Sequence, residues 1–327
     1  MDKLIDKFGR TINYLRLSVT DRCNLRCVYC MPGCGVKWVA RGDVLRFEEI
    51  HHIVRVGASV GLTRVRLTGG EPLVREGVVE LVRMLSKVSG LAGLALTTNG
   101  VLLSRFARSL AHARLRRINI SLDTLRPDRF SQITRFGSLS DVLSGIEAAL
   151  EAGLNPVKLN VVVIRGVNDD EIVEMARLTI DRPLHVRFIE LMPIGGYFTH
   201  ERFFPQHEIL ERLMELGRLN PIASAVGCGP AKTFALNGSR GTIGLIGALT
   251  QAFCAQCNRL RLTATGLLRP CLDQDCGIDI TPALRPFVDR ERIADLLREA
   301  VSAKPKQHQM AIRKADPVRF CMSGIGG

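Results

Sequence analysis

The sequence predicts an α/β protein, in which an incomplete barrel of parallel strands and helices is followed by a smaller α+β domain. Strand-like and helix-like segments alternate along the first two-thirds of the 327-residue chain, as is typical of a parallel sheet. The predicted strands are polar on one face. After about Gly217 the alternation gives way to irregular, glycine-rich sequence. We therefore expect a barrel domain over residues 1–217 and a second domain over residues 218–327.

Six apolar runs are predicted to be strands, and helical patterns lie between them. The strands are expected at residues 14–19, 64–68, 94–98, 117–122, 157–164 and 185–191. Apolar residues recur at steps of three and four in the intervening segments 48–60, 77–88, 104–113, 141–152 and 169–180. Ser104 and Ser140 are expected to be helix N-caps.

The polar face of the strands indicates what the barrel contains. Successive side chains of a strand point to opposite faces, so Arg16, Arg66 and Lys158 are expected on the side away from Leu17 and Leu67. A parallel strand covered by helices on both sides is apolar on both faces. A closed barrel fills its lumen with branched apolar side chains. We therefore expect an incomplete barrel whose lumen holds a large anionic ligand.

The charge and cysteine content restrict the class of protein. Lys and Arg number 45 against 32 Asp and Glu, a net charge of +13. A basic solvated surface explains most of this excess, and a phosphate-rich small substrate can explain some of the rest. Stable nucleic-acid binding is not expected, because the positive residues are dispersed and aromatic residues are few. We expect no membrane span, and ten cysteines without an export signal indicate metal ligation in a reducing cytoplasm.

A CxxxCxxC motif follows the first predicted strand, at Cys23, Cys27 and Cys30. Thiolates suit iron–sulfur clusters, and three closely spaced thiolates leave one iron of a four-iron cube open to a ligand. A partial zinc site and buried apolar thiols are the alternatives, although this spacing is unusual for structural zinc. The motif favours chemistry at a cluster.

Two glycine-containing motifs follow the next strands. Thr68-Gly-Gly-Glu-Pro72 ends the second strand, and Thr97-Thr-Asn-Gly100 ends the third. Glycines there permit a close backbone approach to an extended ligand, and Glu71 could accept a hydrogen bond from an ammonium group. Each motif alone is only a turn signal. Their shared position matters, since parallel α/β folds bind ligands at the carboxyl ends of their strands.

A second cysteine motif lies in the C-terminal third. Cys254 and Cys257 form a CxxC, and Cys271 follows after thirteen residues. Because Cys276 lies close by, the spacing alone leaves a four-cysteine zinc ribbon and a second cluster equally open.

Together the motifs resemble the GTP 3′,8-cyclase family of molybdenum cofactor biosynthesis, within the radical SAM superfamily. They are TDRCNLRCVYCMP, RLTGGEPL, TTNG, CNRLRLT with its later cysteine, and a terminal Gly-Gly. The resemblance implies a (β/α)6 partial TIM-like barrel with a second iron–sulfur cluster in the C-terminal domain. It also implies a lyase that converts GTP to 3′,8-cyclo-7,8-dihydro-GTP. In that family a 5′-deoxyadenosyl radical abstracts the ribose C3′ hydrogen, and the C3′ radical attacks C8.

The resemblance also implies roles for particular residues. Two [4Fe–4S] clusters are expected, one that binds S-adenosylmethionine (SAM), on Cys23, Cys27 and Cys30, and one that binds GTP, on Cys254, Cys257 and Cys271. SAM is expected to contact Tyr29, Gly70, Ser121 and Met192. GTP is expected to contact Arg16, Arg66, Thr97, Lys158, Arg259, Leu260 and Arg261, although strand alternation turns the Leu260 side chain to the core. Arg187, Gly326 and Gly327 are candidate catalytic residues, and no ligand role is expected for Cys34, Cys228, Cys276 and Cys321.

The family resemblance further implies an electron donor, a homodimer and a downstream pterin-forming enzyme that receives the product. Two other classes stay open from the sequence. Another radical SAM enzyme with an auxiliary cluster, for example one that modifies peptides, would not need Arg259 and Arg261 between its cysteines or a Gly-Gly terminus. A non-enzymatic iron–sulfur or zinc protein would hold closed four-ligand sites.

Overall fold

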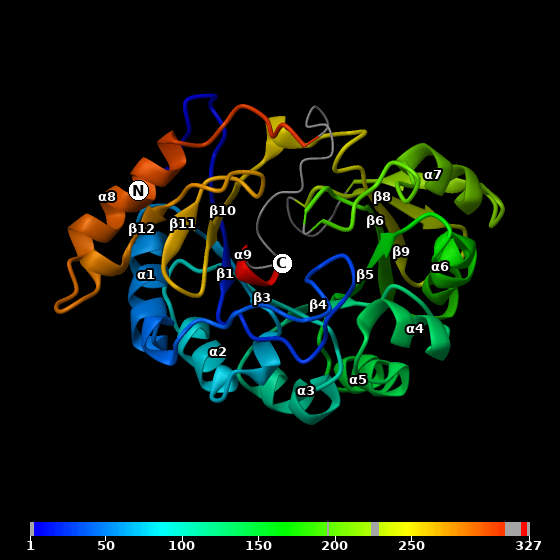
Figure 1. The fold of residues 1–327 in the computed structure, drawn as a ribbon, viewed down its shortest axis with the longest axis horizontal. Helices are drawn as coiled ribbons and strands as arrows, with labels where there is room; N and C mark the ends of the chain where they lie inside the picture. The colour runs from blue at the N-terminus through cyan, green and yellow to red at the C-terminus, as the bar shows by residue number, and fades with distance from the viewer. Residues whose placement is uncertain (1–2, 195, 224–228, 311–321, 326–327) are drawn as a thin grey trace.

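The computed structural model describes residues 3–194, 196–223, 229–310 and 322–325. Within this part of the chain a single curved sheet of twelve strands is lined on its outside by helices. Figure 1 shows helices α1 to α6 in an arc along that outer side, with the short helix α9 inside the arc. None of the described helices has the length and apolar character needed to cross a membrane.

The strands and helices have the following bounds. The first six strands are β1 (Tyr14–Ser18), β2 (Arg64–Thr68), β3 (Gly93–Thr98), β4 (Arg117–Ser121), β5 (Val157–Val163) and β6 (Leu184–Glu190). The later strands are β7 (Leu219–Ile222), β8 (Lys232–Leu236), β9 (Thr242–Ile246), β10 (Arg259–Leu262), β11 (Leu267–Arg269) and β12 (Ile278–Asp279). The α-helices are α1 (Phe47–Ser59), α2 (Val78–Ser86), α3 (Leu103–His112), α4 (Pro127–Thr134), α5 (Leu139–Glu151), α6 (Ile172–Asp181), α7 (Gln206–Met214), α8 (Arg290–Ser302) and α9 (Met322–Ile325).

The sheet is an open one with a parallel centre. Strands β1 to β6 pair in chain order, all parallel. The C-terminal third then extends both edges, because β10 pairs parallel to β1 and β9 pairs parallel to β6. Antiparallel strands complete the two flanks, β11 and β12 beside β10, and β8 and β7 beside β9. This is the incomplete barrel that the sequence predicts.

All six predicted strands of the barrel are present, each within one residue of its expected bounds. The five expected helices are also present, but α4, α7, α8 and α9 were not anticipated. The expected N-caps are wrong: α3 begins at Leu103 and α5 at Leu139, so Ser104 and Ser140 lie inside the first turn of each helix. The expected domain boundary at residue 217 falls in the loop between α7 and β7. Because the strands before and after it belong to one sheet, the boundary stays a prediction.

The apolar faces of the strands form the core beneath the helices. Leu15, Leu17 and Leu67 are fully buried, as are Ile118 and Leu159 on later strands. Helix α5 packs on α3, and α8 packs on α1, so the helical layer covers this face. The alternate side chains of the same strands point to the inner face, which is where the site lies.

Candidate active site

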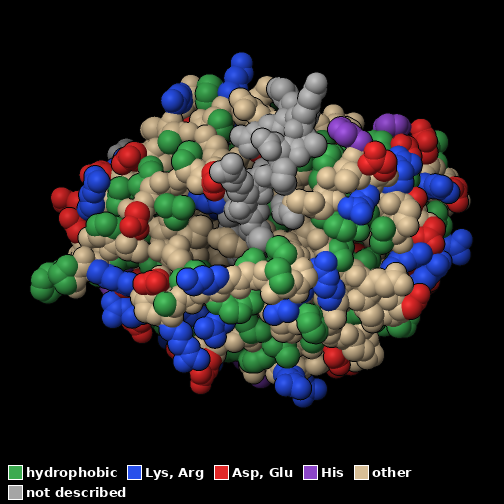
Figure 2. Space-filling model, in the orientation of Figure 1, with side chains coloured by type: hydrophobic (Ala, Val, Ile, Leu, Met, Phe, Trp, Pro, Cys, Tyr) green, Lys and Arg blue, Asp and Glu red, His purple; other side chains and the backbone are tan. Residues whose placement is uncertain are grey.

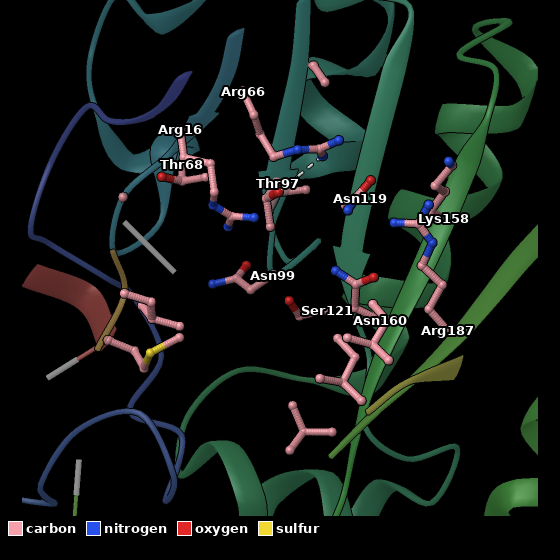
Figure 3. Close-up of a pocket in the computed structure, with 18 of the residues that line it drawn as sticks. Arg16, Arg66, Thr68, Thr97, Asn99, Asn119, Ser121, Lys158, Asn160 and Arg187 are labelled. Atoms are coloured by element: carbon pink, nitrogen blue, oxygen red, sulfur yellow. Dashed lines mark hydrogen bonds between the residues drawn. The ribbon is translucent and has the colours of Figure 1, made fainter. Parts of the chain in front are cut away.

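The inner face of the sheet encloses a cavity of about 340 Å³. Side chains from all six central strands line it, together with β10 and the loops at both ends. Figure 3 shows Arg16, Arg66, Lys158 and Arg187 projecting from their strands into this space. The predicted assignment of polar side chains to the lumen is therefore confirmed. Ser18, which strand alternation would place on the same face as Arg16, does not line the cavity: it is fully buried, and its hydroxyl donates to the carbonyl of Thr20.

The cationic side chains of the cavity lie at the middle and in the amino-terminal half of the strands. Arg16 on β1 stands opposite Arg66 on β2 and opposite Arg261 on β10, whereas Lys158 lies on β5, three strands beyond β2. The Arg66 guanidinium donates to the Tyr14 hydroxyl at 2.5 Å and to Thr97 Oγ1 at 3.3 Å. The described acidic residues of the cavity lining, Glu71 and Asp123, follow the carboxyl ends of their strands.

The electrostatics of these cations follow from burial and from one another. Burial, with Arg187, Arg66 and Arg117 nearby, lowers the pKa of Lys158 to about 7. Burial and Arg66 lower the pKa of Arg187 to about 10. Burial and the charge of Arg261 lower the pKa of Arg16 well below its ordinary value. Positive charges that depress one another in this way are stabilised when a polyanion enters, so the lumen is suited to a phosphate-rich ligand.

Neutral polar groups separate the cations from the cysteines. The side-chain oxygens of Asn119 on β4 and Asn160 on β5 are buried and have no hydrogen-bond partner among the described residues. Both line the cavity, where Ser121 on β4 stands opposite Asn160 on β5 (Figure 3). Buried acceptors without a donor are costly, so these oxygens fit a ligand that supplies hydroxyl or amine hydrogens.

The first cysteine motif forms a compact loop at the carboxyl ends of the strands. The Cys27 carbonyl accepts from the amides of Cys30 and Met31, which turns the chain so that the thiols face the cavity. The Tyr29 hydroxyl donates to Asp123 at 2.6 Å and anchors the loop to the end of β4. Burial raises the pKa of Cys23 to about 11 and that of Cys27 well above its ordinary value, so these thiols need a metal to ionise.

The Gly-Gly-Glu-Pro segment lies directly against this loop. A Cβ atom built on Gly70 would stand 2.3 Å from the Arg22 carbonyl oxygen, so only glycine allows this approach. The Glu71 carboxylate accepts from Leu73 N, Thr98 Oγ1 and Asn99 N, at 3.0, 2.7 and 2.6 Å. Glu71 thus joins the ends of β2 and β3, and its expected role as acceptor for an ammonium stays a prediction.

The second cysteine motif is built on a hairpin. Cys257 precedes β10 and Cys271 follows β11, and these strands are antiparallel, so the two thiols lie at the same end. Cys254 begins the 3₁₀ turn Cys254–Gln256, in which the Cys257 amide donates to the Cys254 carbonyl. Phe253 and Leu272 beside them line the cavity. The second triad therefore borders the same space as the first.

The two triads lie at opposite ends of neighbouring strands. Cys23 follows the carboxyl end of β1, whereas Cys257 precedes the amino end of β10, which runs parallel to β1. A five-residue strand spans roughly 16 Å. Arg16 and Arg261 stand between these ends, in register. The space between the triads is therefore long enough for an extended small molecule, and its two arginines suit one that is negatively charged.

No three His, Cys, Asp or Glu side chains of the described residues stand close enough together to hold one metal ion. A four-iron cube takes one thiolate for each iron, so its ligands stand further apart than those of a single zinc ion. Cys34 and Cys276 are exposed. Cys228 and Cys321 lie outside the described residues, as do Gly326 and Gly327.

The remaining predicted site residues are placed as follows. Tyr29, Gly70, Ser121 and Met192 line the cavity, as do Thr97 and Arg259. The Leu260 side chain is fully buried in the core, so only its backbone can face a ligand. Helix α9 reaches the first loop, where the Met322 amide donates to the Cys30 carbonyl at 3.3 Å. Sequence reasoning missed Arg10 and Lys304, which donate to backbone carbonyls of the second motif, and Glu190, which accepts from the amides of Leu249 and Thr250 before it. Each of the three is an isolated charge with no local signal in the sequence.

Comparison with protein families divides the chain into two parts. Residues 17–179 match the Radical SAM superfamily, and residues 184–310 match the family described as Molybdenum Cofactor Synthesis C. A protein of Pelotomaculum thermopropionicum named GTP 3′,8-cyclase is 52% identical over 98% of this chain and 99% of its own length. Proteins of the same name are 51% identical in Moorella thermoacetica (98% of this chain, 99% of the relative) and 48% identical in Geobacter sulfurreducens (99% and 100%).

Solved structures of low sequence identity share the fold. Streptococcus suis SuiB bound to S-adenosylmethionine has a TM-score of 0.64 and 14% identity, over 89% of this chain and 66% of SuiB. The protein anSMEcpe with bound AdoMet has a TM-score of 0.57 and 16% identity, over 91% of this chain and 82% of its own. These likenesses agree with the predicted incomplete α/β barrel.

Proposed function

This chain belongs to the GTP 3′,8-cyclase family of radical SAM enzymes, and we propose that its cationic lumen holds GTP between two [4Fe–4S] clusters. Family membership establishes a lyase that uses SAM and a [4Fe–4S] cluster and acts on GTP in molybdenum cofactor biosynthesis. The observation that supports the proposal is the arrangement of the lumen. Buried cations stand between the first cysteine triad, which lines the cavity, and the second, whose neighbours Phe253 and Leu272 line it.

The first triad fits a cluster with an open iron. Cys23, Cys27 and Cys30 sit on a loop beside the cavity, and Gly70, which lines the same cavity, lets the backbone after β2 pack directly against this loop. When bound, this cluster supplies the electron that cleaves SAM and yields a hydrogen-abstracting radical. The chain's own part is to hold SAM through Tyr29, Gly70, Ser121 and Met192. Asp123 fixes the loop through Tyr29.

GTP is placed by charge. Arg16, Arg66 and Lys158 receive the triphosphate, with Arg187 as a further phosphate or catalytic partner. Thr97, which accepts from Arg66, keeps that guanidinium in the lumen. The backbone at Leu260 and the side chains of Arg259 and Arg261 close the other side, beside the second triad. The base then lies at Cys254, Cys257 and Cys271, which hold the second cluster, and the ribose faces the SAM end.

The C-terminal glycines complete the site. Helix α9 is seated on the first cysteine loop through Met322, and Gly326 and Gly327 follow it in sequence. Residues without side chains can thread where others cannot. Removal of both glycines is expected to reduce cyclisation sharply without loss of the fold, and unchanged turnover would refute this role.

The proposal includes partners and location. An external reductant supplies the electron, a pterin-forming enzyme takes the labile product, and the protein acts in the cytoplasm as a homodimer. The barrel domain extends to residue 217 and the cluster-bearing domain covers residues 218–327.

The test is anaerobic reconstitution followed by addition of SAM, reductant and GTP. About eight irons per chain, with release of 5′-deoxyadenosine only when GTP is present, is the expected result. Replacing Cys271 by Ala should lose about four irons, whereas replacing the exposed Cys276 should lose none. Release without GTP would indicate a different radical SAM enzyme, and zinc without release would indicate a structural metal protein.

A further inference from the structure

A buried lysine connects the strand segments that carry the second triad. Lys304 follows α8 and is only 3% exposed. Its ammonium donates to the Arg259 carbonyl at 2.8 Å and to the Pro270 carbonyl at 2.6 Å. Arg259 lies two residues after Cys257, and Pro270 directly precedes Cys271. The Lys304 side chain therefore connects the start of β10 with the end of β11, where Cys257 and Cys271 lie.

The Lys304 charge faces the thiols rather than a carboxylate. Among the ion pairs of the described residues none includes Lys304. The ammonium instead lies within electrostatic reach of the Cys257 and Cys271 thiols, between the two backbone segments to which it donates. A buried cation needs a counter-charge, and thiolates are the anions at hand.

The third cysteine is held by the same segment. We call residues 304–310 the strap. The His308 amide of the strap donates to Cys254 Sγ at 3.5 Å. Arg10, near the start of the chain, donates to the Cys254 carbonyl at 2.8 Å and to the strap carbonyls of Pro305 and Lys306 at 2.6 and 3.0 Å. The strap therefore touches every cysteine-bearing segment of the second motif.

We propose that Lys304 is a positioning residue of the second cluster, which fixes the hairpin cysteines and sets the reduction potential with its buried positive charge. The proposal rests on the proposed function, in that Cys254, Cys257 and Cys271 hold a cluster. Groups just outside the ligands orient them, and their loss commonly weakens metal binding by about tenfold or more. A positive charge near the sulfurs favours the reduced, more negative cluster, so it raises the potential.

The experiment uses the full-length chain with Cys23, Cys27 and Cys30 replaced by Ala, so that only the second cluster is present. Lys304→Met is compared with Lys304→Arg, which keeps the charge, and with Lys306→Met, which removes the exposed lysine of the strap. Iron per chain, the rate of iron loss to a chelator, and the midpoint potential by EPR-monitored titration are measured. Lys304→Met should lose iron about tenfold faster. At the midpoint potential of the parent, the ratio of reduced to oxidised cluster in Lys304→Met should fall about tenfold. For a one-electron couple this corresponds to a midpoint potential that is ~59 mV lower.

Each outcome decides the matter. Lys304→Arg should recover most of the potential, and Lys306→Met should match the parent. Lys304→Met with the iron retention and potential of the parent would overturn the role of Lys304 while leaving the second cluster intact. If Lys304→Met cannot be purified folded, Lys304→Arg with a parental retention rate but a shifted potential would equally overturn it. A parent that binds no iron would overturn the second cluster and, with it, this inference.

Discussion

With GTP held as proposed, the charge state of Lys158 should make GTP binding depend on pH. Burial, Arg187, Arg66 and Arg117 lower its pKa to about 7 in the free protein. A bound triphosphate replaces this repulsion by attraction, so the pKa returns toward its ordinary value of 10.5. Only the protonated lysine attracts the phosphates. GTP affinity is therefore greatest below pH 7 and falls as the pH rises from 7 toward the pKa of the complex.

The size of the effect follows from linkage. At pH 8 about one Lys158 in eleven is protonated in the free protein, against one in two at pH 7. The dissociation constant for GTP should thus rise about fivefold between pH 7 and pH 8. Binding at pH 8 should take up about 0.9 of a proton.

Isothermal titration of GTP into cluster-loaded, SAM-free protein measures both quantities, when repeated in buffers of different ionisation enthalpy. Lys158→Met should weaken binding about ten- to a hundredfold at pH 7, the worth of a charge-assisted contact, and should abolish the proton uptake. Lys158→Arg should bind with a flat profile from pH 7 to 9, because arginine does not titrate there. The exposed Lys87→Met is the matched control. A fivefold pH effect that persists in Lys158→Met would refute the reasoning.

Three further perturbations test the framework of the site. Gly70→Ala puts a Cβ against the Arg22 carbonyl and should destabilise the protein by about 1–3 kcal/mol in urea unfolding, whereas Gly42→Ala, which meets open space, should change little. The buried Glu190 carboxylate accepts hydrogen bonds from Gln206 N, Leu249 N and Thr250, the last two in the segment that precedes the second triad. Glu190→Gln should therefore lower the iron content of the second cluster and leave that of the first unchanged. Glu49→Gln should cost about 1–3 kcal/mol at pH 7 but little at pH 2. Although burial raises it, hydrogen bonds from Arg285 and Arg46 lower the pKa of Glu49 to about 2, so its contribution is present above pH 4.5 and is lost as the pH falls. An equal cost at both pH values would contradict this last assignment.

Local patterns predicted the barrel well, because strand alternation and helical spacing are properties of short segments. The inward position of Arg16, Arg66 and Lys158 followed from the period of two and needed no tertiary knowledge. Helix α4 was missed since its sequence is short and largely polar, and only Phe130 and Ile133 with Thr134 are buried. The wrong N-caps arose because each helix begins one residue before its serine.

Long-range pairing was beyond the sequence. Nothing in the Gly-rich C-terminal third indicates that β10 adds to β1 or that β9 adds to β6. Contacts such as those of Lys304 with Arg259 and Pro270 join residues that are 45 and 34 positions apart. A buried lysine of this kind has the same sequence signature as a surface one, so only the fold distinguishes them.

The placement of β10 explains why the two cysteine motifs can act on one molecule. Had β10 paired antiparallel to β1, Cys257 would lie at the same end as Cys23, and the triads would crowd one rim of the barrel. The parallel pairing instead sets them at opposite ends of neighbouring strands, with Arg16 in register with Arg261 between them. A nucleotide that reaches from one end to the other must then cross the cationic region, where its phosphates are stabilised. The same edge pairing that extends the sheet therefore fixes both the length of the site and its charge.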